Sequence, residues 1–233
     1  QFSNMKALKF ICIALCAVLL TTGCGMSNTG KGALIGTGGG AALGAAVGAI
    51  FGGGTGAAIG AGVGAAVGAG AGALIGNRMD KAKKQAEAVQ NAQVESTTDK
   101  NGLQAVKVTF DGGILFATGK TNLTSSAQAS LSEFAANVLN QNKDMDVAIY
   151  GHTDNTGSDA VNNPLSSNRA GAVQSYLLGK GVAASQIKEV RGFGSTSPVA
   201  DNSTEAGRQQ NRRVEIYLYA SQQMIQAAEA QQN

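Results

Sequence analysis

Hydrophobic and polar positions divide the chain into three stretches with different patterns. Residues 10–20 form an unbroken apolar run, and residues 32–76 contain glycine and mostly apolar residues with no charged side chain. From residue 102 onward, two kinds of segment follow each other along the chain. Short segments are apolar or alternate between apolar and polar residues, and longer segments have apolar residues at every third or fourth position. A period of two is typical of strands and a period of 3.6 of helices. The third stretch is therefore predicted to be a folded domain of strands and helices.

This third stretch supplies the predicted fold. Alternation predicts strands over residues 105–110, 146–150, 187–192 and 213–219, and a short extended segment around 114–116. Helical spacing predicts helices over residues 123–139, 165–178 and 205–211. Together they predict an α/β (α+β) sandwich, in which one mixed sheet packs against helices. The domain is placed at residues 102–220, with a polar tail at 221–233.

A polar linker is predicted ahead of this domain, at residues 77–101. Residues 81–93 are rich in Ala, Lys, Gln and Glu, which favours an exposed helix. The polar run at 96–99 is expected to end that helix. The linker is interpreted as a spacer.

The first stretch has the features of a targeting signal. Lys6 and Lys9 precede or flank the start of the apolar run, which has signal-peptide length and is too short to span a bilayer. We predict a signal peptide at residues 1–23, in which residues 1–4 are extra residues ahead of Met5.

Small residues lead to a cysteine in the run Leu20-Thr21-Thr22-Gly23-Cys24. This run resembles the lipobox of bacterial lipoproteins, although Thr21 stands where that motif usually has leucine. The resemblance implies cleavage before Cys24, acylation of Cys24 and a lipidated N-terminus at residues 24–31. It also implies the outer rather than the inner membrane, because Gly25 and not Asp follows the cysteine. The alternative is a plain secretory signal with an incidental cysteine.

Glycine recurs at every fourth position from Gly32 to Gly76. On a helix such a row forms a smooth groove, which lets helices in lipid approach closely. The turn-like run at 52–55 divides the stretch into segments of about 28–30 Å, close to the thickness of a bilayer core. We predict a glycine-zipper helical hairpin at residues 32–76, similar to the glycine-zipper two-helix segments of bacterial envelope lipoproteins. A flexible tether is the alternative.

Basic residues flank this predicted hairpin and are expected to act as membrane-surface anchors. They are Lys31 before it and Arg78, Lys81, Lys83 and Lys84 after it. Self-association of the chain through the zipper is a secondary hypothesis. Whether the hairpin spans the membrane or packs in an oligomer stays open.

Composition narrows the possible functions. Removal of Lys6 and Lys9 with the leader would leave 16 basic and 15 acidic residues, so the mature chain has no charge footprint for nucleic acid. Cys12 and Cys16 would also leave, which makes Cys24 the only cysteine of the mature chain. That excludes an internal disulfide and a cysteine-based metal site.

Several motifs in the third stretch follow one another in a recognisable order. Residues 149–157 read Ile-Tyr-Gly-His-Thr-Asp-Asn-Thr-Gly, and Asn162, Leu165-Ser166 and Arg169-Ala170 follow. Later come Gly192-Phe193-Gly194 and Asn211-Arg212-Arg213-Val214-Glu215-Ile216. Over about residues 103–220 this resembles the OmpA-like C-terminal domain, which is also found in peptidoglycan-associated lipoproteins and flagellar motor proteins. The resemblance implies binding of the diaminopimelate-containing stem peptide of peptidoglycan without cleavage.

The same resemblance assigns the ligand-binding positions to Asp154 and Arg169. Their chemistry fits, because the side-chain end of diaminopimelate is a zwitterion. Asp154 can accept hydrogen bonds from the ammonium, and Arg169 can donate a fork of hydrogen bonds to the carboxylate. Thr153, Asn155 and Asn162 are expected to complete the contacts. The alternative is a structural ion pair between Asp154 and Arg169.

Other side chains receive supporting or structural roles. One of Arg212 and Arg213 is expected to support the Asp154 loop and the other to be solvated. Phe116 is expected in the core, near the pocket. His152 is interpreted as a turn residue, because no histidine or cysteine partner for a metal accompanies it. Ser166 has no base at a recognised spacing.

Three functions follow from these patterns. The first is a non-catalytic lipoprotein that tethers the outer membrane to peptidoglycan. The second is a wall hydrolase or transferase, for which we find no metal triad, nucleophile–base pair or carboxylate dyad. The third is an oligomeric, membrane-embedded glycine-zipper assembly with the wall-binding domain only as its anchor. We favour the first, with no cofactor, no metal and no catalytic residue, and with peptidoglycan and membrane lipid as partners.

Overall fold

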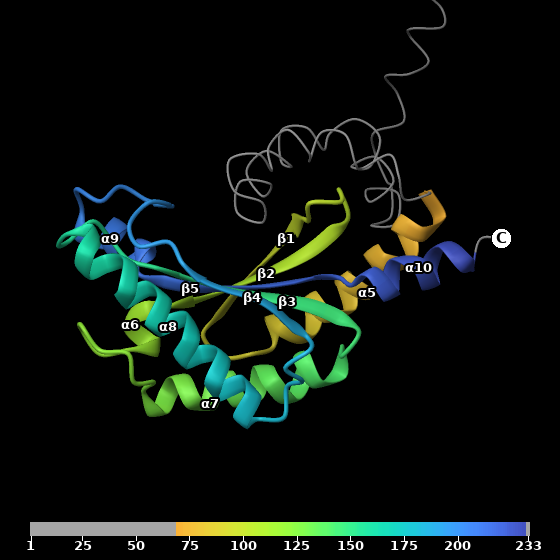
Figure 1. The fold of residues 1–233 in the computed structure, drawn as a ribbon, viewed down its shortest axis with the longest axis horizontal. Coiled ribbons are helices and arrows are strands. Elements are labelled where there is room, and N and C mark those ends of the chain that lie inside the picture. The colour runs from red at the N-terminus through yellow and green to blue at the C-terminus, as the bar shows by residue number, and fades with distance from the viewer. Residues whose placement is uncertain (1–68, 232–233) are drawn as a thin grey trace, which may run out of the picture.

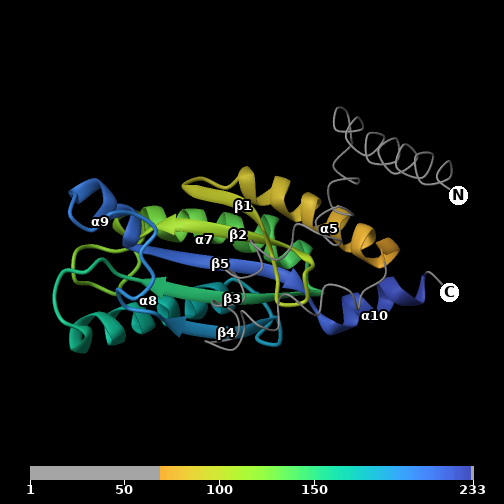
Figure 2. The same ribbon diagram turned by 90° about the horizontal axis from the view of Figure 1, so that it is seen from above.

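A single mixed sheet organises the computed structural model, which describes residues 69–231 (Figure 1). Its strands are β1 (Ala92–Thr98), β2 (Gln104–Asp111), β3 (Met145–His152), β4 (Ile187–Gly192) and β5 (Arg213–Ala220). They lie in the order β1-β2-β5-β3-β4, and all neighbours are antiparallel except the parallel pair β3 and β4 (Figure 2). The predicted mixed sheet is confirmed, and each of the four predicted strands is present.

Helices lie on one face of this sheet and at its two ends. They are α5 (Ala69–Glu87), α6 (Gly112–Leu115), α7 (Ser125–Asn137), α8 (Asp159–Gly179), α9 (Glu205–Asn211) and α10 (Gln222–Ala230), with a 3-10 turn η3 at Leu139–Gln141. Figure 1 shows α7 and α8 side by side beneath the strands. Thr124 begins α7, because its side chain accepts a hydrogen bond from the backbone N–H of Ala127. Helix α8 begins six residues before the predicted start at 165 and contains Pro164, a residue that normally disfavours a helix interior.

The core lies between the sheet and these helices. Alternate residues of the strands point into it, so that Val108 of β2 lies opposite Ile216 of β5, which lies opposite Ile149 of β3. Leu131 and Phe134 of α7 meet them from the helical side and are fully buried. A second, smaller apolar cluster on the other face joins Ala148, Tyr150 and Tyr217.

The segment around 114–116 is helical and not extended as predicted. The side chain of Asp111 accepts a hydrogen bond from the N–H of Gly113 and starts the short helix α6. Phe116 follows the helix with extended dihedral angles and forms an isolated bridge with Leu123. The pattern of apolar residues at 114–116 does not distinguish one helical turn from a short strand.

The predicted linker is part of the folded unit. Helix α5 is not exposed, because Ala71, Ile75, Met79, Ala82 and Ala86 recur every three to four residues and are buried in the core. Residues 92–98, expected to hold the end of a helix and a polar break, form the edge strand β1 instead. Its outer positions are polar, so its pairing with β2 could not be read from hydrophobicity alone.

The predicted polar tail also packs against the domain. Ser221 accepts a hydrogen bond from the N–H of Met224 and so begins α10. Met224, Ile225 and Ala228 are buried on one side of this helix, which lies against α5. Both ends of the packed unit therefore extend beyond the predicted boundaries at 102 and 220.

The predicted hairpin overlaps this unit at its end. Residues 69–76 of the predicted hairpin belong to α5, and Arg78, one of the expected membrane-surface anchors, forms an ion pair with Asp144. Lys83, another of these basic residues, forms an ion pair in which its Nζ lies 3.7 Å from Oε1 of Glu87. Across residues 69–231 no helix is sufficiently long and apolar to cross a membrane. The rest of the hairpin, the signal peptide and Cys24 lie outside the described residues.

A buried carboxylate between β1 and β2 gives the first prediction. Asp99 is 3% exposed, and its Oδ1 accepts hydrogen bonds from the N–H groups of Asn101 (2.8 Å) and Leu103 (2.9 Å). Burial raises its pKa from 3.8 to about 6, although these hydrogen bonds oppose the rise. The folded state therefore binds more protons than the unfolded state between about pH 4 and 6, and stability should fall as pH rises through that window, by about 3 kcal/mol in all.

Asp99→Asn should remove this cost, because the amide oxygen can still accept both backbone hydrogen bonds. We expect its free energy of unfolding at pH 7 to exceed that of the wild type by up to about 3 kcal/mol, with little difference at pH 4. Denaturant titrations at both pH values measure this. Glu229→Gln, which removes an exposed carboxylate on α10, is the control. An equal free energy of unfolding for wild type and Asp99→Asn at pH 7 would contradict the prediction.

Candidate functional site

The predicted site lies at the end of the sheet where β3 and β4 finish and β5 begins, next to α9 (Figure 2). His152, the last residue of β3, pairs with Arg213, the first residue of β5. The chain then continues through Thr153 and Asp154 into the loop before α8. The N–H of Thr153 donates to the carbonyl oxygen of Gly194 (2.9 Å), which ties this loop to the end of β4.

Helix α8 lies unusually close to the strands at this point. A Cβ atom added to Gly151 would overlap the backbone carbonyl of Ser166, and one added to Gly192 would overlap Ser166 and Ser167. The hydroxyl of Ser166 accepts a hydrogen bond from the N–H of Gly194 (2.9 Å) and donates to the carbonyl of Asn163 (2.9 Å). Ser166 is therefore a connector between α8 and the β4 loop. This contact fixes Arg169, one turn further along α8, relative to Asp154.

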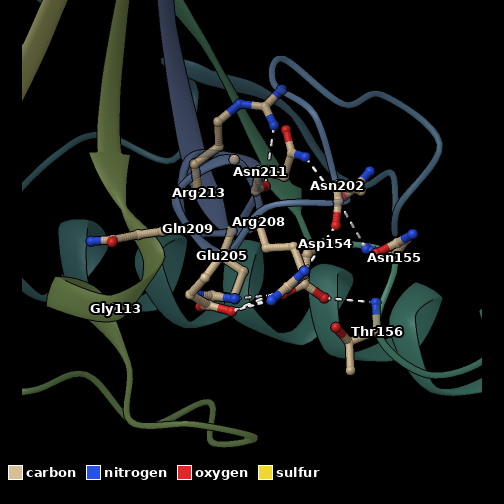
Figure 3. A network of polar contacts seen from close by, with 12 residues as sticks. Gly113, Asp154, Asn155, Thr156, Asn202, Glu205, Arg208, Gln209, Asn211 and Arg213 are labelled. Atoms are coloured by element: carbon tan, nitrogen blue, oxygen red, sulfur yellow. Dashed lines mark hydrogen bonds and ion pairs between the residues drawn. The ribbon is translucent and has the colours of Figure 1, made fainter.

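Asp154 is held on both carboxylate oxygens. Its Oδ1 accepts a hydrogen bond from the N–H of Thr156 (2.8 Å), and its Oδ2 accepts one from Nη1 of Arg212 (2.6 Å). Burial raises the pKa of Asp154, but the hydrogen bonds from Arg212 and Thr156 outweigh it and bring the pKa below its ordinary value. Asp154 is thus an ionised carboxylate at a nearly buried position, 6% exposed. Figure 3 shows it between Thr156 and the residues of α9.

Arg169 lies in a different environment. Its side chain is nearly buried, its Nε donates to the carbonyl oxygen of Lys120 (3.1 Å), and its guanidinium lies 5.0 Å from the centre of the Phe116 ring. Within residues 69–231 no carboxylate lies within ion-pair distance of it, so the predicted alternative of an Asp154–Arg169 ion pair is wrong. Burial lowers the pKa of Arg169, and repulsion from Arg212 lowers it further while Asp154 opposes the change. Arg169 is a desolvated cation without a bound anion among these residues.

The three predicted polar neighbours have three different environments. Asn162 is buried, and its amide donates to the carbonyl oxygens of Thr156 (3.1 Å) and Asp154 (3.4 Å), so it supports the loop from α8. Asn155 is exposed, and its N–H donates to the side chain of Asn202 (3.3 Å). The hydroxyl of Thr153 is buried and has no hydrogen-bond partner among residues 69–231.

Both arginines at the start of β5 have ionic partners. Arg212 supports Asp154, as expected of one of the pair. Arg213 is not solvated, which corrects the other half of that prediction: it is 5% exposed and bonds to Glu215 through Nε (2.8 Å). Its other nitrogens donate to the backbone carbonyls of Asn211 (3.2 Å) and Ser197 (3.1 Å). Arg212 lies one residue before β5 and Arg213 is the first residue of that strand, and their side chains bond to different partners.

His152 is a strand residue and not the predicted turn residue. It is 2% exposed, stacks on Phe193 with ring centres 5.4 Å apart, and its Nε2 lies 3.5 Å from a carboxylate oxygen of Glu215. Burial lowers its pKa, with the nearby Glu215 acting in the opposite direction. In residues 69–231, no three His, Cys, Asp or Glu side chains gather as a group that could hold a metal ion.

Sequence reasoning missed the contribution of α9. Glu205 accepts hydrogen bonds from Arg212 Nη2 (2.8 Å) and from Arg208 Nη2 (2.6 Å). Asn211, fully buried at the end of α9, accepts from the N–H groups of Val199 and Ala200 and so fixes the loop before the helix. The spacing of Glu205, Arg208 and Arg212 along a helix is a signal that could have been read from the sequence.

Two parts of the sequence match known protein families. Residues 115–212 match the OmpA family, and residues 5–80 match the YMGG-like Gly-zipper. The peptidoglycan-binding protein ArfA of Mycobacterium tuberculosis is 42% identical over 114 residues, which cover 49% of this chain and 34% of ArfA. The outer-membrane lipoprotein YfiB of Pseudomonas aeruginosa is 40% identical over 107 residues, which cover 46% of this chain and 62% of YfiB. The chain thus spans about a third of ArfA and less than two thirds of YfiB.

A solved structure has a similar fold. The cell wall anchor of the T6SS from Pseudomonas aeruginosa superimposes with a TM-score of 0.51 at 28% identity, over 62% of this chain and 98% of that one. The chain therefore carries an OmpA-like domain behind a Gly-zipper segment.

The close approach of α8 and β3 gives the second prediction. Gly151→Ala should push the backbone of Ser166 away and lower the free energy of unfolding by about 1–3 kcal/mol, the usual cost of overpacking. Gly171→Ala is the matched control, because a Cβ at that position of α8 meets nothing within 4 Å. It should raise the free energy of unfolding by about 0.5–1 kcal/mol through helix propensity. Chemical denaturation measures both, and a Gly151→Ala variant as stable as the wild type would contradict the assigned contact.

Proposed function

We propose that this protein is a non-enzymatic envelope lipoprotein that tethers the outer membrane to the cell wall by binding peptidoglycan. Two observations carry the proposal. The guanidinium of Arg169 is desolvated and has no anionic partner among the described residues. Asp154, at the end of the neighbouring strand β3, is an ionised carboxylate. The names of two relatives support it, since ArfA is a peptidoglycan-binding protein and the T6SS structure is a cell wall anchor.

The ligand group we assign to this site is the side-chain end of diaminopimelate. A buried cation without a counter-ion is costly, and a carboxylate that binds to it recovers that cost. The carboxylate of the ligand would bind to Arg169 above the Phe116 ring, and its ammonium would donate to Asp154. Each charge-assisted hydrogen bond contributes about 1.5–3 kcal/mol. A wall whose stem ends in a lysine side chain offers no such carboxylate, so the site should discriminate against it.

The loop residues complete this proposal with separate roles. Thr153 offers a buried hydroxyl that has no partner within the described part of the chain, which suits a further contact with the ligand. Asn162, on α8, would support the loop through its hydrogen bonds to the carbonyl oxygens of Asp154 and Thr156. Asn155 is exposed at the rim of the loop, where it can contact the rest of the stem peptide.

Attachment to the membrane is assigned to Cys24. The lipobox-like run before it and the name of YfiB, an outer-membrane lipoprotein, support an acylated cysteine in the outer membrane. A protein fixed there meets many stems of the wall lattice at high effective concentration, so a modest affinity for one stem is sufficient. The domain would then lie in the periplasm.

Sedimentation with isolated sacculi tests the function, using residues 69–231 so that α5 and α10 are retained. The wild type should pellet with sacculi that contain diaminopimelate. Asp154→Asn and Arg169→Gln should each weaken this binding by about tenfold or more, because each removes a charge-assisted contact. Asp144→Asn, which also breaks a carboxylate–arginine pair but lies before β3 at the other end of that strand, is the matched control and should pellet like the wild type.

Two outcomes would contradict the proposal. In one, the folded wild-type domain stays in solution. In the other, the Asp154 and Arg169 variants, shown to be folded by circular dichroism, pellet as well as the wild type.

A further inference from the structure

Arg212 stands between two carboxylates at the edge of the proposed site. One nitrogen of its guanidinium, Nη1, bonds to Asp154 Oδ2 at 2.6 Å, and the other, Nη2, bonds to Glu205 Oε1 at 2.8 Å. Glu205 is held in turn by Arg208, whose Nε and Nη2 both donate to its Oε2. Arg208 Nη1 donates to the carbonyls of Asn202 and Ser203, which fixes Arg208 to the loop before α9. Figure 3 shows Asp154, Glu205 and Arg208 close together.

This arrangement determines how Arg212 meets Asp154. A guanidinium and a carboxylate prefer to pair through two parallel hydrogen bonds. Here the second nitrogen is directed to Glu205, so Arg212 binds only one oxygen of Asp154. The other oxygen, Oδ1, has the N–H of Thr156 as its partner and keeps acceptor capacity for a ligand ammonium.

Arg212 also affects the second half of the site. Burial lowers the pKa of Arg169, and repulsion from the charge of Arg212 lowers it further. If Arg212 were released, it could close on Asp154 with both nitrogens and displace an ammonium, or turn to a ligand carboxylate. Either movement would favour anionic ligands over zwitterionic ones.

From these contacts we infer that Glu205 is a specificity-determining residue: by holding Nη2 of Arg212, it keeps the site selective for a ligand that carries an ammonium beside its carboxylate. Glu205 acts through Arg212 and is a positioning residue with no ligand contact of its own. The inference rests on the proposed function, because it assumes that Asp154 and Arg169 bind the zwitterion.

The test compares two synthetic stem tripeptides by calorimetry with the full chain in detergent. One ends in meso-diaminopimelate, and the other ends in 2-aminopimelate, which keeps the distal carboxylate and lacks the distal ammonium. For the wild type, the ratio of the two dissociation constants should favour diaminopimelate. Glu205→Gln should reduce this ratio roughly three- to fivefold, the effect of a partly exposed ion pair, and Glu205→Asp should restore part of it.

Controls separate this role from a structural one. Glu87→Gln removes an exposed glutamate that lies near Lys83 on α5, and it should leave the ratio unchanged. If Glu205→Gln weakens both tripeptides equally, Glu205 only stabilises α9 and the inference is wrong. If the wild type binds both tripeptides and Glu205→Gln changes neither affinity, the inference is also wrong while the proposed function stands. If the wild type binds neither tripeptide, the proposed function fails, and the inference with it.

Discussion

The contact of one backbone with another, between α8 and the ends of β3 and β4, is the constraint on which the site depends. Gly151 and Gly192 have no Cβ, and the backbone at Ser166 and Ser167 occupies the space that a side chain would need. Because this distance is fixed by main-chain atoms, it cannot adjust by rotation of a side chain. It sets how far Arg169, on α8, lies from Asp154, just after β3. A zwitterion has a fixed separation of charges, and a site built for one needs such a rigid spacing.

Buried charge on the other face of the sheet supports the same end of the molecule. Glu215 accepts hydrogen bonds from Arg213 Nε and from the hydroxyl of Tyr217, both at 2.8 Å. Burial alone would raise the pKa of Glu215, but His152 and Arg213 bring it far below the ordinary value. This carboxylate is therefore ionised and satisfied beneath the strand that leads to Asp154. Arg212, at the end of α9, serves the candidate site, while its neighbour Arg213, in β5, serves this network.

The sequence was informative where periodicity and motif agree, and less so where packing decides. Strands such as β5 alternate or are apolar throughout, and their positions were predicted within one or two residues. Residues 81–93 were expected to form an exposed helix, because two of the buried residues there are alanines, Ala82 and Ala86, which add little to a hydrophobic pattern. Asp154 and Arg169 could be singled out by their motifs. The partner of Asp154 could not, because Arg212 follows it by 58 residues and the pairing depends on sheet register.

The positions of α5 and the candidate site suit a tether. The zipper stretch runs into the first residues of α5, and α5 meets α10 at one end of the sheet, whereas α9 lies at the other end (Figure 2). Asp154 follows β3 at that same end. If the N-terminus is fixed in a membrane and the ligand in the wall, as proposed, tension enters at α5 and leaves near β3. The strands run between these two ends, so the load acts along them and must shear many ladder hydrogen bonds together. The buried side of α5 and its ion pair with Asp144 then secure the point where the load enters. The domain itself would then resist unfolding under that tension.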